Sequence, residues 1–293
     1  MSELKFISVV IPTFNRKSML KLCLESFNKQ SYPVTHFEVL VIDDGSSDGT
    51  EEFIEGYREH INFKLIYYRQ KNGGPAAARN RGVKEAKGAL VAFTDDDCVV
   101  DEHWLAECNR SFNESYIGGA GGVIVQKTSG TISDYLVHIK ALNPPAPNGE
   151  PYYLVTANAC YRRDVLLEVG GFEEAIKNPG GEDPDLSMKV KEKGYKLRFN
   201  PDNIVYHFHK SDIRSFYKTY FNYGRGSHYI CNKWGNGVFK EPEKITFLNF
   251  LSLSNLKLIR KYYREAGVKY ALPFWFLQNI QMLALSRGFQ KGY

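Results

Sequence analysis

The sequence of 293 residues has few cysteines and no long apolar run, and both absences exclude classes of protein. Its five cysteines are odd in number and include no Cys-x-x-Cys pair, which argues against a disulfide framework and a zinc site and favours a reducing compartment. The longest apolar stretch, residues 270–285, includes a proline and three amide side chains. A spanning helix needs ~20 apolar residues, so this stretch is too short and too polar to cross a membrane.

Two common nucleotide-binding motifs are also absent. The chain contains no GxxxxGK sequence, so it has no P-loop, and no GxGxxG follows its first apolar run, which disfavours a Rossmann dehydrogenase. Apolar residues at 43% and charged residues at 24% are ordinary for a globular protein with a large core. Because the first residues run directly into a strand-like segment, we expect no signal peptide and a cytoplasmic protein.

What stands out is a run of three aspartates, Asp95, Asp96 and Asp97, which closes the apolar segment 90–94. Adjacent carboxylates repel one another, and a divalent cation is the usual remedy. Oxygen-rich sites suit Mg²⁺ or Mn²⁺, especially where a diphosphate supplies further oxygens. These residues therefore predict an enzyme that handles a nucleotide diphosphate through a metal.

The first half of the chain alternates strand-like and helix-like segments. The strand-like runs cover 6–11, 37–42, 63–68 and 90–94, and the helix-like segments cover 18–30, 50–57 and 74–86. Continuous apolar strands separated by helices predict a parallel sheet with helices on both faces. Ligands of such sheets bind beyond the carboxyl ends of the strands, where Pro12-Thr13, Asp43-Asp44 and the three aspartates all fall.

The second half changes character. We expect strands at 118–125, 196–199 and 204–209, helices at 135–142 and 185–193, and a helical, aromatic tail from 213 onward. From residue 240 to the last residue the tail has nine Lys or Arg against three Glu, a surplus larger than the net charge of +5 of the whole chain. Such a tail fits an anionic membrane surface or a lipid phosphate, and it fits equally a solvated face of packed helices.

Taken in order, the motifs resemble those of family 2 glycosyltransferases with the GT-A fold. SVVIPTFNR at 8–16, VIDDGSSDGT at 41–50 and NGGPAAARNRG at 72–82 resemble three blocks of that family, and the three aspartates resemble its DXD signature. Segments 158–163, 170–174 and 181–186 resemble its acceptor-side blocks, so the likeness covers roughly residues 5–210 in unbroken order.

The resemblance implies an α/β protein in which helices flank a mostly parallel central sheet. A GT-A catalytic domain would cover residues 1–212, with 1–125 binding the nucleotide sugar and 126–212 facing the acceptor, and a C-terminal helical extension would cover 213–293. It also implies a set of donor-binding residues: Pro12, Thr13, Asn15, Arg16, Asp44, Gly74, Arg79, Asp95 and Asp96.

Two of these residues have a chemical interpretation that does not depend on the resemblance. Asp44 can accept a hydrogen bond from an imide N–H, which uracil has and cytosine lacks, so the donor is expected to be a UDP-sugar. The charge and the two-pronged geometry of the Arg79 guanidinium suit contact with a diphosphate. The alternatives are that Asp43-Asp44-Gly45 forms only a turn and helix cap, and that the glycines at 73 and 74 only permit tight packing.

For the metal, Mn²⁺ or Mg²⁺, the resemblance implies Asp97 as a ligand, with Asp95 at the ribose and Asp96 near the sugar. The family often adds a downstream histidine, and His207 matches that position best. His209 is the reserve, because alternate residues face the same side of a strand. Either histidine is equally compatible with a purely structural role.

Glu182 and Asp183 are the expected catalytic residues. Sugar transfer with inversion needs one general base beside the acceptor hydroxyl, and the resemblance assigns this role to Asp183. We expect Glu182 and Asp185 to raise the pKa of Asp183 by like-charge repulsion. The same segment fits a helix start, with Asp183 as the N-cap and Pro184 at the first position, and the two roles are compatible.

One departure from the family bears on the reaction. Processive members carry a Gln-x-x-Arg-Trp motif, and this chain instead has Tyr-Gly-Arg-Gly-Ser at 223–227. We therefore predict transfer of one hexosyl or N-acetylhexosaminyl unit to a carbohydrate or lipid-linked saccharide, in cell-surface polysaccharide or glycoconjugate biosynthesis, with no nucleic-acid partner. Asn158, Arg225 and Lys218 are further candidates for acceptor or phosphate contacts. The rival hypotheses are a catalytically silent sugar-nucleotide-binding scaffold and a sugar nucleotidyltransferase.

Overall fold

The computed structural model describes residues 3–208, 212–235, 241–244 and 254–293. The chain forms two compact units. The first takes the residues up to 127 together with 142–177 and 182–208, and the second takes 128–141, 178–181 and the residues from 209 onward. Short pieces of the predicted catalytic region thus belong to the second unit.

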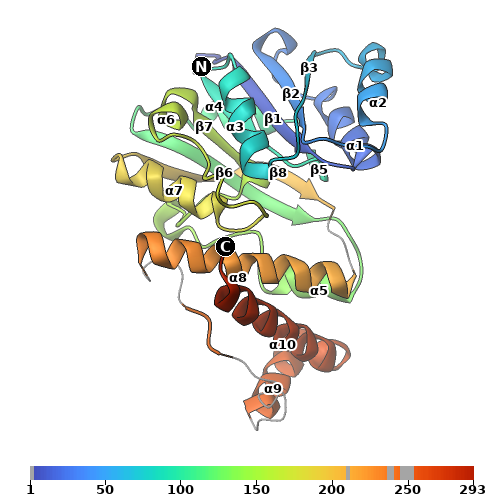
Figure 1. Cartoon of the computed structure of the whole chain (residues 1–293), viewed down its shortest axis with the longest axis vertical. Helices are drawn as coiled ribbons and strands as arrows, with labels where there is room; N and C mark the ends of the chain where they lie inside the picture. Colours follow the sequence, from blue (N-terminus) through green and yellow to red (C-terminus); the bar gives the residue numbers. More distant parts are fainter. Residues whose placement is uncertain (1–2, 209–211, 236–240, 245–253) are drawn as a thin grey trace. The chain divides into compact units, whose positions relative to one another are not determined.

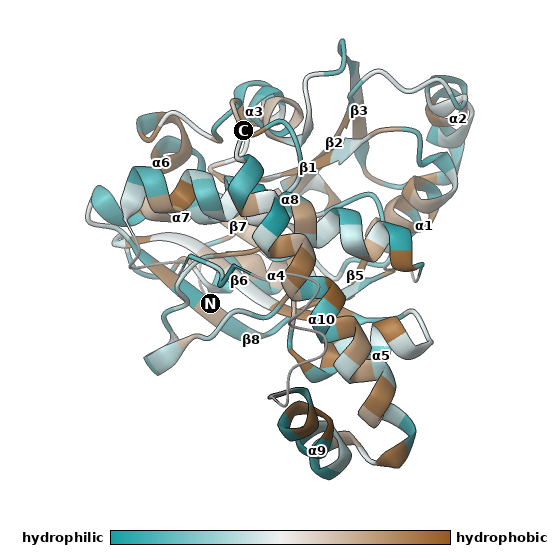
Figure 2. Ribbon diagram, turned by 60° about the horizontal axis from the view of Figure 1, so that its bottom comes forward, coloured by the Kyte–Doolittle hydropathy of each residue, from teal (hydrophilic) through white to brown (hydrophobic). Residues whose placement is uncertain are grey.

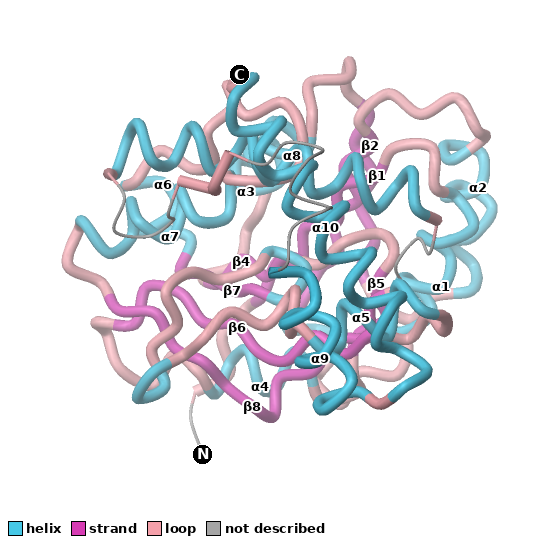
Figure 3. The backbone as a smooth tube through the Cα atoms, turned by 90° about the horizontal axis from the view of Figure 1, so that it is seen from below, coloured by secondary structure: helices cyan, strands magenta, loops and turns pink. Residues whose placement is uncertain are grey.

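The first unit is built on an eight-stranded sheet (Figure 1). In chain order its strands are β1 Ile7–Thr13, β2 Phe37–Asp43, β3 Lys64–Arg69, β4 Leu90–Phe93, β5 Cys98–Val100, β6 Ile117–Gln126, β7 Ala159–Arg162 and β8 Lys196–His207. Their order across the sheet is β3-β2-β1-β4-β7-β6-β8-β5. The pairs joining β3, β2, β1 and β4 are parallel, as the apolar runs predict, and so is β6 with β8. The pairs β4–β7, β6–β7 and β5–β8 are antiparallel, so the sheet as a whole is mixed. Figure 3 shows β4, β7, β6 and β8 following one another across the sheet.

Helices cover both faces of this sheet. They are α1 Lys17–Phe27, α2 Thr50–Tyr57, α3 Pro75–Glu85, α4 Trp104–Arg110, α6 Arg163–Glu168 and α7 Glu182–Glu192. Successive strand residues point to opposite faces, so Val9 belongs to an apolar cluster with side chains of α1, α2 and α4, whereas Val10 belongs to a second cluster with those of α3, α6 and α7. Two apolar layers therefore fix the sheet and leave the carboxyl ends of its strands free for polar residues.

Several predicted boundaries move. Pro12 and Thr13 are the last residues of β1 and do not form a turn after it. A proline is tolerated there because the pairing of β1 with β4 ends at Val10, so no residue of β4 needs a hydrogen bond from the N–H that Pro12 lacks. Thr50 is the first residue of α2, and Gly49, in the left-handed conformation, is its cap. The two runs 196–199 and 204–209 form one strand, β8, with a register shift between them.

The second unit is helical. It contains α5 Thr131–His138, α8 Ile213–Trp234, α9 Ser254–Ala266 and α10 Val268–Lys291. Its apolar cluster is rich in aromatic rings, with Tyr135, Phe216 and Phe274 buried together. A β-carbon on Gly288 would lie 1.9 Å from the carbonyl oxygen of Phe221, so α8 and α10 approach as closely as glycine allows. Among the residues described, no helix is long and apolar enough to cross a membrane.

Candidate active site

The carboxyl ends of β1 and β4 bring the first polar residues together. The Thr13 hydroxyl donates to Asp96 Oδ2 at 2.8 Å. Arg16 Nη1, in the turn after β1, donates to Asp96 Oδ1 at 3.0 Å and to Asp97 Oδ2 at 2.7 Å. The aspartates are thus met by a guanidinium from a segment about 80 residues away in sequence, as expected where neighbouring strands end at one edge.

Asp96 is the most deeply buried of the three aspartates. Burial raises its pKa to about 7, and the charge of Asp97 adds to this, while Arg16 and the Thr13 hydroxyl act in the opposite direction. A carboxyl with this pKa is about half protonated at neutral pH. The cluster of three aspartates therefore holds less negative charge than its sequence suggests, and any added cation changes the protonation of Asp96.

Asp44 organises the glycine turn before α3. Its Oδ1 accepts from the backbone N–H of Gly73 at 2.9 Å and from Gln70 Nε2 at 2.8 Å, and its Oδ2 accepts from the N–H of Gly74 at 2.8 Å. Gly74 has φ +90°, and a β-carbon there would lie 2.6 Å from the carbonyl oxygen of Lys177. Asp44 and Gly74 are therefore parts of one turn, and a bond from Asp44 to a base would be an additional contact.

Asn15 joins the turns that follow β1 and β2. It adopts a left-handed conformation with φ +53°. Its Oδ1 accepts from the N–H of Ser47 at 2.8 Å, and its own N–H donates to the Ser46 hydroxyl at 2.9 Å. Asparagine tolerates this conformation better than most residues, so it suits the position. Pro12 and Asn15 thus shape the backbone at the edge of the sheet.

Arg79 occupies the centre of the site and not its open edge. It projects from α3, is 5% exposed, and pairs with Asp95 Oδ1 at 2.8 Å and with Glu182 Oε1 at 3.2 Å. The sequence predicted that it reaches a diphosphate; here both ends of its fork already hold carboxylates. A buried guanidinium between two acids serves as their shared counter-ion. Arg79 consequently connects the aspartate cluster to the start of α7.

Asp183 lies within the first turn of α7, because the helix begins at Glu182 and not after Asp183 as the N-cap reading predicted. Its carboxylate accepts from the Thr156 N–H at 3.1 Å and from the Thr156 hydroxyl at 2.8 Å. Burial raises its pKa to about 7, with Glu182 adding repulsion, while Arg79 and Thr156 act to lower it. Asp185 is not among these causes, since its carboxylate pairs with Lys189 at 2.9 Å.

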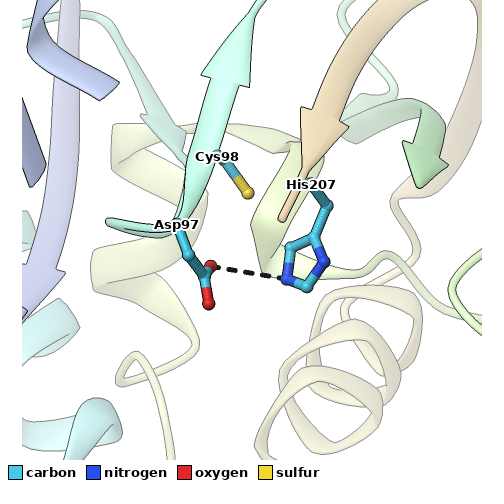
Figure 4. Close-up of side chains that lie close together, drawn as sticks. All are labelled: Asp97, Cys98 and His207. Atoms are coloured by element: carbon cyan, nitrogen blue, oxygen red, sulfur yellow. Dashed lines mark ion pairs between the residues drawn. The ribbon is translucent and has the colours of Figure 1, made fainter. Parts of the chain in front are cut away.

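Asp97, Cys98 and His207 form the cluster in which a cation could be held (Figure 4). One ligand atom from each lies within 4.8 Å of the others, and His207 Nε2 is 3.4 Å from Asp97 Oδ1. Burial opposes protonation of His207, but its contact with Asp97 outweighs burial and raises its pKa. A carboxylate oxygen, an imidazole nitrogen and a thiol are chemically suited to a divalent transition metal. His209, the reserve ligand, lies outside the described residues.

The acceptor-side candidates are placed differently. Asn158 is buried, and its amide donates to the carbonyl oxygens of Val123 and Asn203 and accepts from the Trp104 indole, so it holds the core together and has no free group for a ligand. Arg225 belongs to the second unit, where its Nε donates to the carbonyl oxygen of Gly292 at 2.6 Å. Lys218 lies exposed on α8. The acceptor-side roles of these three residues stay predictions.

Comparison with known proteins identifies the family. A model described as glycosyl transferase family 2 matches residues 8–170, and one described as glycosyl transferase family group 2 matches residues 90–286. The chain belongs to glycosyl transferase family 2. Glycosyltransferase AglE of Haloferax volcanii is 29% identical over 208 residues, covering 70% of this chain and 68% of AglE. The poly(ribitol-phosphate) beta-N-acetylglucosaminyltransferase TarS of Staphylococcus aureus is also 29% identical, over 70% of this chain but 36% of TarS.

Solved structures give the fold of this glycosyltransferase. The mannosyltransferase PcManGT of Pyrobaculum calidifontis, in complex with GDP-Man and Mn²⁺, superimposes with a TM-score of 0.70 at 18% identity, covering 98% of this chain and 88% of that one. TarS residues 1–349 with UDP-GlcNAc superimpose with a TM-score of 0.57 at 20% identity, covering 98% and 92%. The enzyme therefore has the GT-A fold with a C-terminal helical region, as the sequence motifs implied.

Two residues of this family 2 enzyme escaped the sequence analysis. Thr156 contacts Asp183 from 27 positions away, and nothing in its local sequence marks it. Cys98 directly follows Asp97, so a signal was present, but cysteines were weighed only as pairs. The structure pairs Cys98 with His207 across antiparallel strands, which local spacing does not reveal.

Proposed function

We propose that this glycosyltransferase moves one sugar from a UDP-sugar to an acceptor hydroxyl with inversion at the anomeric carbon. The observation that carries the proposal is Asp183, a carboxyl with a pKa of about 7 that Thr156 holds at the start of α7. Through Glu182, its neighbour, it is joined to Arg79 and hence to Asp95 of the aspartate cluster. A base and a diphosphate-binding cluster connected in this way suit a single displacement.

On the donor side, the nucleotide sugar would lie among four residues, Thr13, Arg16, Asp95 and Asp96. Asp97 and His207 would hold Mn²⁺ or Mg²⁺, and the ion would supply positive charge to the leaving nucleoside diphosphate when bound. His207 would bind as neutral imidazole through Nε2, the nitrogen that lies 3.4 Å from Asp97 Oδ1. Arg16, at present on Asp96 and Asp97, is near enough to turn its guanidinium toward a phosphate.

On the acceptor side, Asp183 would take the proton of the attacking hydroxyl. A base is most effective when its pKa lies near the working pH, because it is then ionised in part and still basic. A carboxyl with an ordinary pKa near 3.8 is a weaker proton acceptor at pH 7, so burial beside Glu182 contributes directly to the reaction. Glu182 is kept in place by Arg79 and would act on Asp183 rather than on the substrate.

The test is a product assay with purified full-length protein, Mn²⁺ or Mg²⁺, a panel of nucleotide sugars and saccharide acceptors. We expect release of UDP that depends on metal and acceptor, and a product whose anomeric configuration, read by NMR, is opposite to that of the donor. Pyrophosphate release would favour a nucleotidyltransferase. Donor binding without turnover across the panel would favour a silent binding protein.

We further propose that a face of α9 and α10 contacts an anionic membrane surface, which would bring the enzyme to a lipid-linked acceptor. Leu256 and Tyr263 on α9 are 57% and 59% exposed, and Val268 and Leu272 on α10 are 78% and 61% exposed. Spacings of seven and four residues place each pair on one side of its helix, and Figure 2 shows hydrophobic and hydrophilic residues mixed along α9.

Positive charge accompanies these apolar side chains. Lys257, Arg260, Arg264 and Lys269 form no ion pair with any residue that the structure describes, whereas the nearby Glu265 contacts His138 and Lys261. Apolar side chains with flanking cations are the pattern of helices that lie in a membrane interface.

Flotation with phosphatidylglycerol vesicles tests this surface. The variant Leu256→Ser/Leu272→Ser should float at least fivefold less than the unchanged chain, and Leu22→Ser, also exposed but on α1, should float normally. Equal flotation of all three proteins, or equal flotation with neutral phosphatidylcholine, would contradict the proposal.

A further inference from the structure

The thiol of Cys98 completes a set of three ligand atoms whose arrangement resembles part of a metal site. Cys98 is the register partner of His207 in the antiparallel pair β5–β8, so the two side chains leave the same face of the sheet directly opposite each other. Asp97 precedes Cys98 at the start of β5 and directs its carboxylate to the same point (Figure 4). All three donor atoms lie within 4.8 Å of one another.

The separations are close to those that a small cation requires. Metal–ligand bonds of about 2.1 Å in a tetrahedral site put neighbouring ligand atoms about 3.4 Å apart. The Asp97 Oδ1 to His207 Nε2 distance is 3.4 Å, so these two ligands already have that spacing. For Cys98, the outer limit of 4.8 Å leaves a movement of about an ångström, which rotation of one side chain supplies.

The kinds of donor atom determine which metal fits. Mg²⁺ and Mn²⁺ prefer oxygen ligands, whereas Zn²⁺ and Co²⁺ bind sulfur and imidazole nitrogen more strongly. One carboxylate, one imidazole and one thiolate match three-ligand zinc sites that keep a fourth position open. The absence of Cys-x-x-Cys pairs, which argued against zinc in the sequence, does not bear on a site whose ligands come from two strands.

We propose that Cys98 is a third protein ligand at this position, and that Asp97, Cys98 and His207 together bind Zn²⁺ or Co²⁺ without any donor substrate. The inference rests on the proposed metal role of Asp97 and His207 and extends it to a ligand and a metal preference. Binding replaces the S–H bond of Cys98 by a sulfur–metal bond and releases the proton to solvent, as coordinated thiols do. Oxidation plays no part, so no further reactant is needed.

The state of the free thiol agrees with this chemistry. Cys98 is 1% exposed, so its thiol lies buried beside the carboxylate of Asp97 and the imidazole of His207. The carboxylate of Asp97 beside this thiol attracts a cation, and a bound cation favours the thiolate. A reactive, exposed cysteine would lack this protection, so Cys98 is suited to ligation rather than to surface redox chemistry.

Cobalt titration of the metal-free, full-length protein tests the proposal directly. We expect a sulfur-to-cobalt charge-transfer band in the near ultraviolet, saturating at one Co²⁺ per chain. Cys98→Ser should abolish the band. Cys23→Ser is the matched control, because Cys23 is also buried and its Sγ lies 3.6 Å from the carbonyl oxygen of Asp95. It should keep the band.

A competition assay with a chromophoric chelator gives a second readout. Cys98→Ser should weaken Zn²⁺ binding at least tenfold and change Mn²⁺ binding less than twofold, because only the softer metal gains from sulfur. Should Cys98→Ser fail to fold, X-ray absorption of the zinc-loaded, unchanged protein must show one sulfur at about 2.3 Å.

These outcomes separate the thiol site from the transfer reaction. Absence of the cobalt band in the unchanged protein, its persistence in Cys98→Ser, or a zinc shell without sulfur would overturn the proposal. Sugar transfer with Mn²⁺ is measured by UDP release in a separate assay. A cobalt band that depends on Cys98, in a protein without transfer activity, would leave the thiol ligand standing and overturn the proposed function instead.

Discussion

Replacement of Asp183 by asparagine should make the enzyme slower and, at alkaline pH, more stable. Loss of a general base typically reduces turnover 10²- to 10⁴-fold, which corresponds to ~3–5 kcal/mol of transition-state stabilisation. The contacts survive in part, because the asparagine carbonyl still accepts from the Thr156 N–H and its amide can donate to the Thr156 hydroxyl. Binding of UDP should therefore change little.

The stability effect follows from the direction of the pKa shift. The folded state raises the pKa of Asp183 from 3.8 to about 7, so it binds more protons than the unfolded state between these values and loses stability as pH rises through them. This shift corresponds to ~4 kcal/mol, and because Asp183 keeps partial contact with solvent, which screens its charge, we expect about 2 kcal/mol. Asp183→Asn removes this loss, so it should melt a few degrees higher at pH 8 and show no gain at pH 4.

The assays are UDP release under saturating donor and thermal unfolding at the two pH values. Turnover of the unchanged enzyme should rise with pH up to about 7 and then level off, because Asp183 must be ionised to act. Asp164→Asn is the control: it makes the same chemical change in the first turn of α6 and should alter neither quantity. Turnover of Asp183→Asn within twofold of normal, or a pH dependence centred near 4, would refute the reasoning.

Three further substitutions probe the rest of the site. Arg79→Gln leaves the buried carboxylate of Glu182 and the partly exposed one of Asp95 without their counter-ion, so the unfolding free energy measured in urea should fall by about 3 kcal/mol. The milder Arg79→Lys should shift the pH dependence of turnover to higher pH, because a lysine lowers the pKa of Asp183 less than the guanidinium does. Arg16→Gln removes a cation that competes for the aspartates, so Mn²⁺ binding without donor, followed by electron paramagnetic resonance, should tighten severalfold; unchanged binding would exclude that competition. Gly74→Ala combines φ +90° with a carbonyl oxygen 2.6 Å from the new methyl group, and should destabilise more than Gly130→Ala, where φ is +114° and nothing lies within 4 Å; equal melting temperatures would contradict the close approach.

The sequence is most informative where a local pattern has one structural solution. Strands β1 and β2 are seven-residue, mostly apolar runs that are almost wholly buried, and the short β4 is marked by the three aspartates that soon follow it. Strands β5 and β7 have three and four residues, and the sequence analysis did not find them, because so short a segment carries no periodicity. They exist because the longer neighbours β8 and β6 offer a ladder to pair with.

The site divides in the same way, between residues marked by a local sequence pattern and contacts that only the fold creates. The order of motifs brought Asp97 and Asp183 forward as candidates, because each lies in a segment with its own local pattern. The partners of Arg79 depend on a contact spanning 103 residues, and the expected diphosphate contact did not anticipate them. Thr156 likewise reaches Asp183 only through the packing of two segments. Sequence reasoning thus named many of the charged groups and could not say which of them neutralise one another.

That neutralisation determines how the site can accept a substrate. The guanidinium of Arg16 pairs with Asp96 and Asp97, and that of Arg79 pairs with Asp95 and Glu182. A fifth carboxylate, that of Asp183, is influenced by the charge of Arg79 without an ion pair. Even with Asp96 and Asp183 each half protonated near pH 7, the acids outnumber the cations. A nucleotide diphosphate alone would add negative charge to this excess, whereas a divalent cation first removes it. Because His207 and Asp97 are already in contact, we expect the cation to occupy this position first and the affinity for the donor to rise once it is filled. We therefore expect an order of binding, metal before donor, that is set by the negative charge of these carboxylates.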